Sequence, residues 1–354
     1  MSVTANQAFE LQEKLLGWYD RHRRVMPWRA RPGQLPDPYQ VWLSEIMLQQ
    51  TTVAAVKPYF ESFISRWPSV EKLAEADLDA VLQCWAGLGY YARARNLHKC
   101  ARIVTADYGG IFPDTIEALL KLPGIGPYTA AALASIAFNQ PVVAVDGNVE
   151  RVMARFFGVE TPLPEVKPAL KQAAESVGYN NNRPADFTQA FMELGAIVCT
   201  PKSPKCTICP WQSTCRAYHL GSADTLPRRK AKAPKPKRYG NVFWITDDKG
   251  RVLLRRRPEN GLLGGMMEFT SSLWQEGGYL PVSSADIPVE AKSIATPEAE
   301  IRHVFTHFEL YLTPYSFVYA GSGTDKPPYK WVEPKMLRNE ALPSVMMKVK
   351  KIFT

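Results

Sequence analysis

Four cysteines near the middle of the chain have a spacing that suits a metal site. Gaps of six, two and five residues separate Cys199, Cys206, Cys209 and Cys215. Four thiolates at such short range can bind a tetrahedral zinc ion or a [4Fe–4S] cluster, and a Cys-x2-Cys pair occurs in both. A zinc ribbon usually carries a second Cys-x2-Cys knuckle, which this segment lacks. The spacing therefore favours a [4Fe–4S] cluster.

Two isolated carboxylates could form an acid–base pair. Glu45 is the only charged residue from 41 to 56, and Asp146 is the only one from 122 to 149. A charge in apolar surroundings costs free energy unless it is partnered or functional. Burial in a helix should raise the pKa of Glu45, whereas the start of a helix should keep Asp146 ionised. The structural alternatives are an arginine partner for Glu45 and an N-cap role for Asp146.

A Pro-Gly-x-Gly turn lies directly before an alanine-rich helical segment. Gly124 and Gly126 belong to this turn, in LPGIGPYTAAALASIAF. Glycines let backbone N–H groups approach a phosphate, and the following helix adds the positive end of its dipole. The same pattern also fits an ordinary tight turn between two helices.

Two domains of different class are expected to position these residues. Residues 1–220 show apolar residues at helical spacing, which predicts an all-α domain. Residues 221–238 are rich in Pro, Lys and Arg and should form an extended linker. Residues 239–354 predict a smaller α+β domain. It should contain two strands joined at an Asp-Lys-Gly turn, an alternating segment over 303–320 and a final helix over 343–353.

Composition bounds the environment of the chain. The 354 residues are 46% hydrophobic and 22% charged, which suffices for two cores without disulfides. No apolar stretch approaches the length of a membrane span, and the N-terminus lacks the apolar core of a secretory signal. We therefore expect a monomer in the cytoplasm, associated with the nucleoid if the source is bacterial.

The net charge of +9 is concentrated in one segment. Residues 228–238 hold seven Lys and Arg and no acid, so the rest of the chain carries only about two positive charges. Overall basicity is thus weak support for nucleic-acid binding. The basic segment could steer DNA, act as an import signal or form a solvated spacer.

The cysteine arrangement resembles the cluster loop of the endonuclease III superfamily of DNA glycosylases. The resemblance covers roughly residues 10–220 and includes three further motifs upstream of the cysteines in the order that the family requires. It implies a helix-hairpin-helix glycosylase fold, with Gly124 and Gly126 in the DNA-binding hairpin. Such enzymes extrude a base from duplex DNA and fill the gap. The segment Leu48 to Thr51 would fill it.

Within that segment, the resemblance assigns the wedge to Gln50, with Leu48 and Thr51 beside it. Tyr90 would enter the base stack from the other side. The plainer alternatives are a helix end for Gln50 and a packed aromatic ring for Tyr90.

The family's chemistry needs both isolated carboxylates. Cleavage of a purine N-glycosidic bond requires a proton donor for the base and an anion for the oxocarbenium-like sugar. The segment VDGNVERVMAR resembles the catalytic aspartate segment of the family. The resemblance thus implies Glu45 as the general acid and Asp146 as the stabilising or attacking anion.

Tyr128 indicates which branch of the superfamily the chain resembles. Members that also nick the strand carry a Schiff-base lysine at this hairpin position, and a phenol cannot form the imine. With the SEIMLQQT segment and the second domain, this tyrosine makes the chain similar to the MutY family of adenine DNA glycosylases. The implied substrate is duplex DNA with adenine opposite 8-oxoguanine or, less efficiently, guanine. Tyr128 would hydrogen-bond near Asp146 and the sugar.

The same resemblance assigns binding residues in both domains. Trp28, Arg29 and Gln189 would line the adenine pocket, although core packing and a helix surface are alternatives for the first and last. The C-terminal domain resembles Nudix hydrolases, and its residues Phe305, Thr306 and His307 would recognise 8-oxoguanine. The family commonly has Ser in place of this Thr. Residues 271–284 lack the Glu-rich metal-binding helix of a hydrolase, so we expect recognition without catalysis.

Three other readings compete with this one. A lyase for damaged pyrimidines is disfavoured by Tyr128, and an inactive DNA-binding scaffold by the presence of both carboxylates. A zinc-dependent DNA-binding module is the third.

The cluster is expected to have a structural role, because hydrolysis of the N-glycosidic bond transfers no electron. It should brace a loop in which Lys202 and Lys205 meet the DNA backbone.

Overall fold

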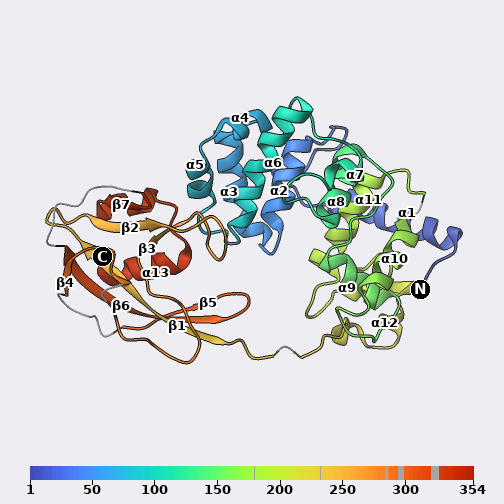
Figure 1. Ribbon diagram of the computed structural model, residues 1–354. Coiled ribbons are helices and arrows are strands. Elements are labelled where there is room, and N and C mark those ends of the chain that lie inside the picture. Colours follow the sequence, from blue (N-terminus) through green and yellow to red (C-terminus); the bar gives the residue numbers. More distant parts are fainter. Residues whose placement is uncertain (179, 232, 284–285, 294–298, 320–326) are drawn as a thin grey trace. The chain divides into compact units, whose positions relative to one another are not determined.

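The fold is described from a computed structural model of the chain, which describes all residues except 179, 232, 284–285, 294–298 and 320–326 (Figure 1). Contacts divide the chain into two units. The first comprises Met1–Glu75 and Lys99–Lys232, and the second comprises Ala76–His98 and Ala233–Thr354. The domain limits expected at 220 and 238 stay a prediction. The contacts add the segment 76–98 to the second unit.

Helices make up the first 220 residues, as predicted. They are α1 (Ala5–His22), α2 (Pro38–Leu48), α3 (Val53–Arg66), α4 (Val70–Glu75), α5 (Leu78–Trp85), α6 (Ala92–Tyr108), α7 (Ile116–Leu119), α8 (Pro127–Phe138), α9 (Gly147–Phe156), α10 (Lys167–Gly178), α11 (Pro184–Glu193) and α12 (Arg216–His219). A π-helical turn, Leu194–Val198, continues α11, and short 3-10 turns follow at Cys206–Ile208, Gln212–Thr214 and Ala223–Thr225.

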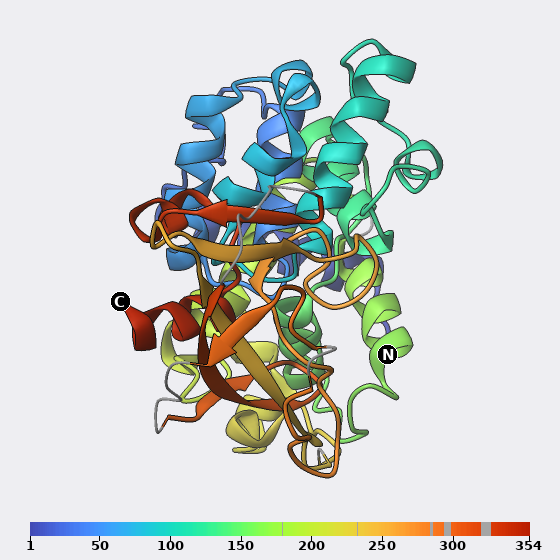
Figure 2. The same cartoon turned by 60° about the vertical axis from the view of Figure 1, so that its left-hand side comes forward.

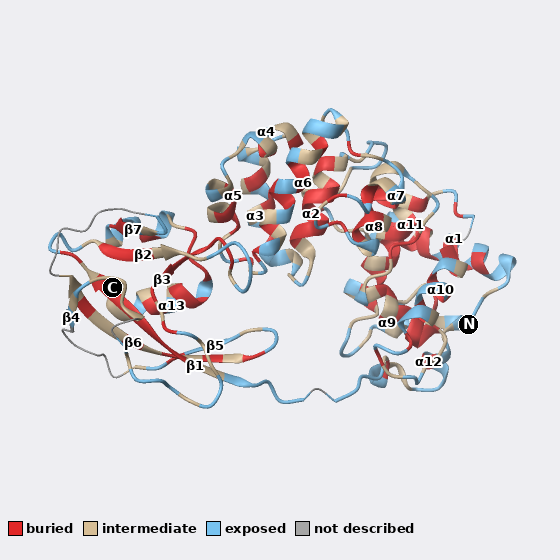
Figure 3. Ribbon diagram, viewed as in Figure 1, coloured by how far each residue is buried: buried red, intermediate tan, exposed pale blue. Residues whose placement is uncertain are grey.

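Local capping fixes where the helices around the later site begin. The side chain of Asp37 accepts a hydrogen bond from the N–H of Tyr39 at the start of α2. Gly126 precedes α8, whose first residue is Pro127, a residue suited to a first helical turn. The helix α8 packs between α2 and α11 and is buried over most of its length (Figure 3). Its alanines allow this close approach of neighbouring helices.

The core of the first unit joins its two sequence ends. Leu15 and Tyr19 of α1 pack with residues of α9, α10 and α11 and with Trp211 of the cysteine segment. The indole Nε1 of Trp211 donates a hydrogen bond of 2.9 Å to the carbonyl of Leu11. The cysteine segment is therefore part of the core and not a surface appendage.

The second unit contains a mixed β-sheet, as predicted for the C-terminal third. Its strands are β1 (Lys237–Thr246), β2 (Val252–Arg256), β3 (Met267–Phe269), β4 (Ala291–Ser293), β5 (Ile301–Val304), β6 (Glu309–Tyr319) and β7 (Tyr329–Val332). The order is β3-β2-β1-β6-β4, with β5 paired to β6 and β7 to β2. The parallel pair of β1 and β6 runs in register from Lys237 opposite Glu309 to Thr246 opposite Val318.

Two sequence predictions for this unit, the pair of strands and the final helix, are confirmed. The alternating segment predicted over 303–320 is divided by a turn, and residue 320 lies outside the described residues. β1 and β2 pair antiparallel around the Asp-Lys-Gly turn, β5 and β6 form a hairpin, and α13 (Ser344–Phe353) ends the chain. Residues of α13 pack with one face of the sheet in a core that includes Val242, Leu310 and Val345 (Figure 2). A smaller cluster around Phe243 and Trp331 covers the other face.

The predicted linker, residues 221–238, is hydrogen-bonded near both of its ends. A 3-10 turn occupies Ala223–Thr225, and Leu163 then forms an isolated parallel bridge with Arg229. β1 already begins at Lys237. The first part of the predicted linker is thus bonded to the first unit and its last residues belong to β1 of the second unit. Within the described residues, no helix has the length and apolar character needed to cross a membrane.

Candidate active site

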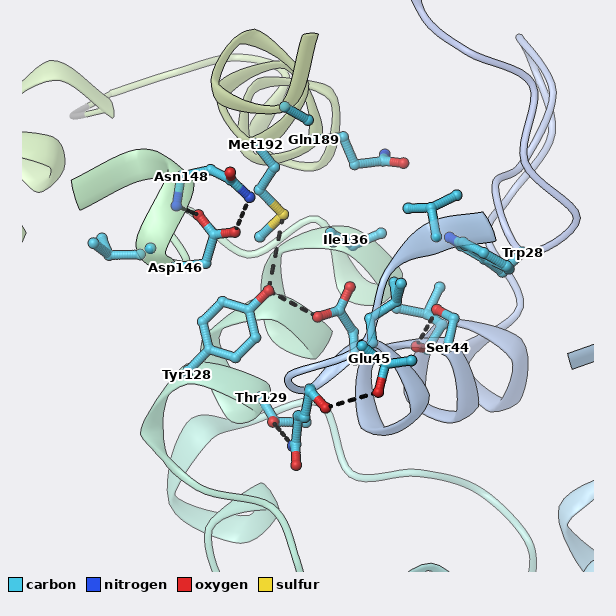
Figure 4. A pocket seen from close by; sticks show the side chains of 18 of the residues that line it. Trp28, Ser44, Glu45, Tyr128, Thr129, Ile136, Asp146, Asn148, Gln189 and Met192 are labelled. Atoms are coloured by element: carbon cyan, nitrogen blue, oxygen red, sulfur yellow. Dashed lines mark hydrogen bonds between the residues drawn. The ribbon is translucent and has the colours of Figure 1, made fainter. Parts of the chain in front are cut away.

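A pocket of about 790 Å³ in the first unit brings the sequence-predicted residues together (Figure 4). It is bordered by α2, the turn before α8, the start of α9 and α11. The predicted residues in its lining are Trp28, Arg29, Glu45, Leu48, Gln50, Thr51, Gly124, Gly126, Tyr128, Asp146 and Gln189. Residues from more than 160 positions of sequence thus meet in one cavity, as an active site requires.

Glu45 is a buried acid within this pocket. Glu45 is only 8% exposed. Burial raises the pKa of its carboxyl to about 7, although a hydrogen bond from Tyr128 opposes the rise. The charge of Arg29 also lowers it, but that guanidinium bonds Glu193. No ion pair of Glu45 occurs among the described residues. The carboxyl can therefore hold a proton near neutral pH.

Asp146 is the N-cap of α9. Its Oδ1 accepts hydrogen bonds from the N–H groups of Asn148 (2.9 Å) and Val149 (2.8 Å), and its Oδ2 accepts one from Asn148 Nδ2 (2.6 Å). Burial nevertheless raises the pKa of Asp146, because desolvation outweighs these bonds. The N-cap role, which the sequence offered as the structural alternative, is confirmed. That Asp146 stays ionised remains a prediction. Burial decides the direction in which its pKa shifts.

Tyr128, near the start of α8, is hydrogen-bonded to Glu45. Its hydroxyl donates a hydrogen bond of 2.9 Å to Oε2 of Glu45 and lies 3.9 Å from the sulfur of Met192. Burial and the nearby charges of Glu45 and Asp146 raise the pKa of the phenol well above its usual value, so it remains a donor. The bond expected near Asp146 is thus directed to Glu45 instead.

The segment after α2 has the backbone of a tight corner. Gln50 is exposed and has a φ of +58°, a conformation that residues with a side chain rarely adopt. The preceding Gln49 donates a hydrogen bond of 3.2 Å from Nε2 to Oγ1 of Thr129 on α8. The hairpin turn also needs glycine, since Gly124 has a φ of +79°. The corner and the hairpin are therefore linked across the pocket.

Sequence reasoning missed a buried ion cluster in the pocket wall. Glu193 has a side chain 1% exposed and bonds the guanidinium of Arg24 at 2.7 and 2.9 Å and that of Arg29 at 3.2 Å. Glu193 is the only charged residue from 187 to 201. The test that singled out Glu45 and Asp146 would have found it.

The other predicted wall residues and one further cation complete the pocket. Trp28 packs edge-on against Phe60, and the side chain of Gln189 bonds the carbonyl of Ala185 within its own helix. Lys167 also lines the pocket, where its amine forms an ion pair of 2.9 Å with Glu150.

The four predicted ligand cysteines line a second, smaller cavity. Cys199, Cys206, Cys209 and Cys215 share it with Arg155, whose Nη1 donates to Sγ of Cys199 at 3.3 Å. In the part of the chain that the structure describes, no three His, Cys, Asp or Glu converge as ligands of one ion. Four thiols around one space are a donor set that can hold an iron–sulfur cluster.

The remaining predicted residues lie in the second unit. Phe305–Phe308 forms the turn of the β5–β6 hairpin, closed by a hydrogen bond of 2.9 Å from the N–H of Phe305 to the carbonyl of Phe308. Thr306 and His307 are exposed at its tip. The hydroxyls of Tyr90 and Thr306 lie 2.6 Å apart, within one unit. Tyr90 itself has a φ of +50° and an exposed ring.

Models of three known protein families match parts of the chain. The HhH-GPD superfamily base excision DNA repair proteins match residues 43–178, and the iron-sulfur binding domain of endonuclease III matches residues 199–215. The NUDIX domain matches residues 241–351. Four cysteines around one cavity, in a loop of this family, bind a [4Fe–4S] cluster.

Individual relatives narrow the class. The adenine DNA glycosylase of Rattus norvegicus is 35% identical over 401 residues, which cover 97% of this chain and 77% of that protein. The adenine DNA glycosylase of Mycolicibacterium smegmatis is 43% identical over 217 residues, 61% of this chain and 72% of that protein. A solved thermostable thymine-DNA glycosylase is 30% identical, with a TM-score of 0.53, over 61% of this chain and 98% of that chain.

Helical fold, cluster loop and pocket together define a DNA glycosylase of base excision repair, an enzyme that acts on DNA. Within that class, the chain belongs to the adenine DNA glycosylase family.

Proposed function

We propose that the enzyme hydrolyses the N-glycosidic bond of adenine mispaired with 8-oxoguanine, and less efficiently with guanine, and leaves an abasic site. The observation that carries this proposal is the pairing of Tyr128 with Glu45 in the pocket that also holds Asp146. It supplies a carboxyl with a pKa of about 7 beside a second carboxylate that accepts three N–H bonds.

The two carboxylates have complementary tasks. Glu45 gives its proton to the departing adenine, since its raised pKa keeps a proton available near neutral pH. Asp146 stabilises the oxocarbenium-like sugar or attacks it, and the N–H groups of Asn148 and Val149 hold its oxygens in place. Water supplies the hydroxyl of the abasic sugar. Tyr128 orients the carboxyl of Glu45 through its hydrogen bond to Oε2.

The strand should remain intact after excision. Tyr128 occupies the hairpin position where an amine would form a Schiff base, and the phenol cannot replace it. Lys167 is the lysine in the pocket lining, but its amine is engaged with Glu150. These features support a glycosylase without lyase activity.

Base extrusion and recognition involve the other predicted residues. Gln50 would fill the gap in the stack, with Leu48 and Thr51 beside it, while the hairpin glycines Gly124 and Gly126 bind the backbone. Trp28, Arg29 and Gln189 would line the adenine site. Tyr90 would stack next to the lesion, and the tip residues Phe305, Thr306 and His307 would read 8-oxoguanine.

The cluster supports DNA binding and takes no part in the hydrolysis. The cluster would be bound by the thiolates of Cys199, Cys206, Cys209 and Cys215 and would cross-link four points of one loop. Lys202 and Lys205 are exposed in the same loop, where their charges can meet phosphates. We further propose that the enzyme works as a monomer in the cytoplasm, on the nucleoid in a bacterial cell.

One incubation tests the proposal. Duplex DNA with adenine opposite 8-oxoguanine is treated with the enzyme, and half of each sample then receives alkali. We expect strand breaks only after alkali, and none with Glu45→Gln or Asp146→Asn. Breaks without alkali would show a lyase, and the absence of breaks in both samples would show an inactive scaffold.

A further inference from the structure

The basic segment 228–238 holds most of the chain's excess charge, and nothing in the reaction uses it. Its first half is attached to the first unit. The carbonyl of Arg228 accepts a hydrogen bond of 2.9 Å from the N–H of Leu163, and its side chain lies 3.3 Å from Glu160. Lys230 pairs with Glu165 at 3.3 Å. These side chains are exposed, so the pairs contribute little stability.

Its second half surrounds the Phe305–Phe308 turn of the second unit. The amine of Lys235 donates a hydrogen bond of 2.8 Å to the carbonyl of Phe305. The carbonyl of Pro236 accepts a hydrogen bond of 2.9 Å from the N–H of Glu309, directly after the turn. The guanidinium of Arg238 lies over the ring of Phe308, 4.6 Å from its centroid, and 3.8 Å from Glu276.

The turn is also anchored from within its own domain. The ring of Phe305 stacks on Phe308 with centroids 4.7 Å apart and meets the rings of His303 and Trp274 at 4.7 and 6.0 Å. Phe308 is buried in the core under the sheet. Lys235 and Arg238 thus act on the two residues that flank the exposed pair Thr306 and His307.

The contact of Lys235 has a geometric consequence. A trans peptide is planar, so the carbonyl of Phe305 and the N–H of Thr306 point in opposite directions in one plane. A cation that holds this carbonyl therefore fixes the direction of the Thr306 N–H at the tip of the turn. Guanine and 8-oxoguanine differ by one oxygen and one N–H, and a discriminating group must be held within about 0.5 Å.

We propose that Lys235 and Arg238 are positioning residues that aim the Phe305–Phe308 turn and so set the preference for 8-oxoguanine over guanine opposite adenine. The two cations act by geometry, whereas Arg228 and Lys230 of the same segment attach the chain to the first unit. The inference rests on the proposed function, because it needs the turn to read the opposite base.

The test compares excision of adenine opposite 8-oxoguanine with excision opposite guanine, under single-turnover conditions, in the full-length protein. The measured quantity is the ratio of the two rates. We expect Lys235→Met and Arg238→Leu each to lower the ratio about threefold, the worth of one exposed hydrogen bond or cation–π contact. The double variant should lower it about tenfold. Lys235→Arg, which can still donate to the carbonyl, should restore the ratio.

Lys230→Met is the matched control, since it removes one charge from the same segment without touching the turn. Affinity for undamaged duplex, measured over a salt series, should fall equally in Lys230→Met and Lys235→Met. A ratio that is unchanged in Lys235→Met and Arg238→Leu, or equally lowered in Lys230→Met, would overturn the inference. If the wild type shows no preference for 8-oxoguanine, the proposed function fails and the inference fails with it, a result visible without any variant.

Discussion

The hydroxyl of Tyr128 donates a hydrogen bond of 2.9 Å to Oε2 of Glu45. Burial alone would drive the pKa of this carboxyl higher, and the bond opposes it because it stabilises the ionised form. The pKa of the Tyr128 phenol is itself raised well above its usual value, so Tyr128 keeps its proton and remains the donor of this hydrogen bond. Burial, opposed by this hydrogen bond, raises the pKa of Glu45 to about 7, where a general acid is most useful.

Tyr128→Phe should move the alkaline limb of the pH–rate profile to higher pH. Loss of the bond removes a stabilisation of the carboxylate, so the pKa of Glu45 rises above about 7. The acid works only when protonated, and activity should persist further into the alkaline range. Single-turnover excision across pH measures the limb. Tyr39→Phe, whose hydroxyl bonds the carbonyl of Trp67, is the control and should leave it in place. A shift to lower pH would contradict the assignment.

Glu45→Gln should remove activity and raise stability in alkaline solution. The folded pKa of about 7 exceeds the ordinary 4.5, so the folded state binds more protons between these values and stability falls as pH rises through this window. Above pH 7 the buried charge costs up to about 3 kcal/mol, which a neutral amide avoids. Denaturant unfolding should show the variant more stable than the wild type at pH 8 and equal at pH 4. Equal stability at both would argue against a buried acid.

Asp146→Asn should separate chemistry from folding. Asparagine caps helices as well as aspartate, so α9 should remain and the melting temperature should change little. The anion beside the sugar is lost, and excision should slow at least about a hundredfold. Binding to a duplex with an uncleavable adenine analogue should stay near the wild-type value. Equal losses of binding and rate would instead indicate a misfolded pocket.

Cys206→Ala should weaken folding and DNA affinity together. Removal of one thiolate breaks the ligand set around the cavity, and the visible absorption of the iron–sulfur chromophore should disappear. The loop then releases Lys202 and Lys205, so affinity should fall along with its salt dependence. Cys84→Ala, outside the loop, should keep the colour. A colourless Cys206→Ala protein with normal affinity would contradict the bracing role.

Thr306→Val should lower the preference for 8-oxoguanine, whereas Thr306→Ser should preserve it. Valine keeps the shape but removes the hydroxyl that lies 2.6 Å from the hydroxyl of Tyr90. Loss of one hydrogen-bonding group at a recognition site costs about 1 to 2 kcal/mol, or about tenfold in the ratio of rates. An unchanged ratio of excision rates in the valine variant would instead assign recognition of 8-oxoguanine to His307 or to the backbone of the turn.

Features that depend on short stretches of sequence could be predicted. The cysteine spacing, the glycine turn before α8 and the isolated charges of Glu45 and Asp146 each follow from a few neighbouring residues. The period of apolar residues predicts the helices of the first 220 residues and the β5–β6 hairpin. The two carboxylates and the glycines of the turn line one pocket, and the four cysteines line another.

Features that depend on tertiary burial could not be predicted from the sequence. The pKa of Asp146 rises because the folded chain desolvates it, a quantity that its helix-start position does not reveal. Likewise, the partner of Tyr128 is Glu45, 83 positions away. The hydrogen bonds of Lys235 and Pro236 to the Phe305–Phe308 turn and to Glu309 after it also depend on tertiary structure, whereas composition predicted only an extended linker for that segment.

The contact between Trp211 and α1 has a consequence for biosynthesis. The indole bonds the carbonyl of Leu11, 200 residues earlier in the chain, and fills the core that α1 closes. During translation α1 emerges first, and its apolar face stays uncovered until the cysteine loop has left the ribosome. We therefore expect cluster insertion and the packing of α1 to be coupled. In cells starved of iron, chains that stop at this step should lose α1 first to proteases.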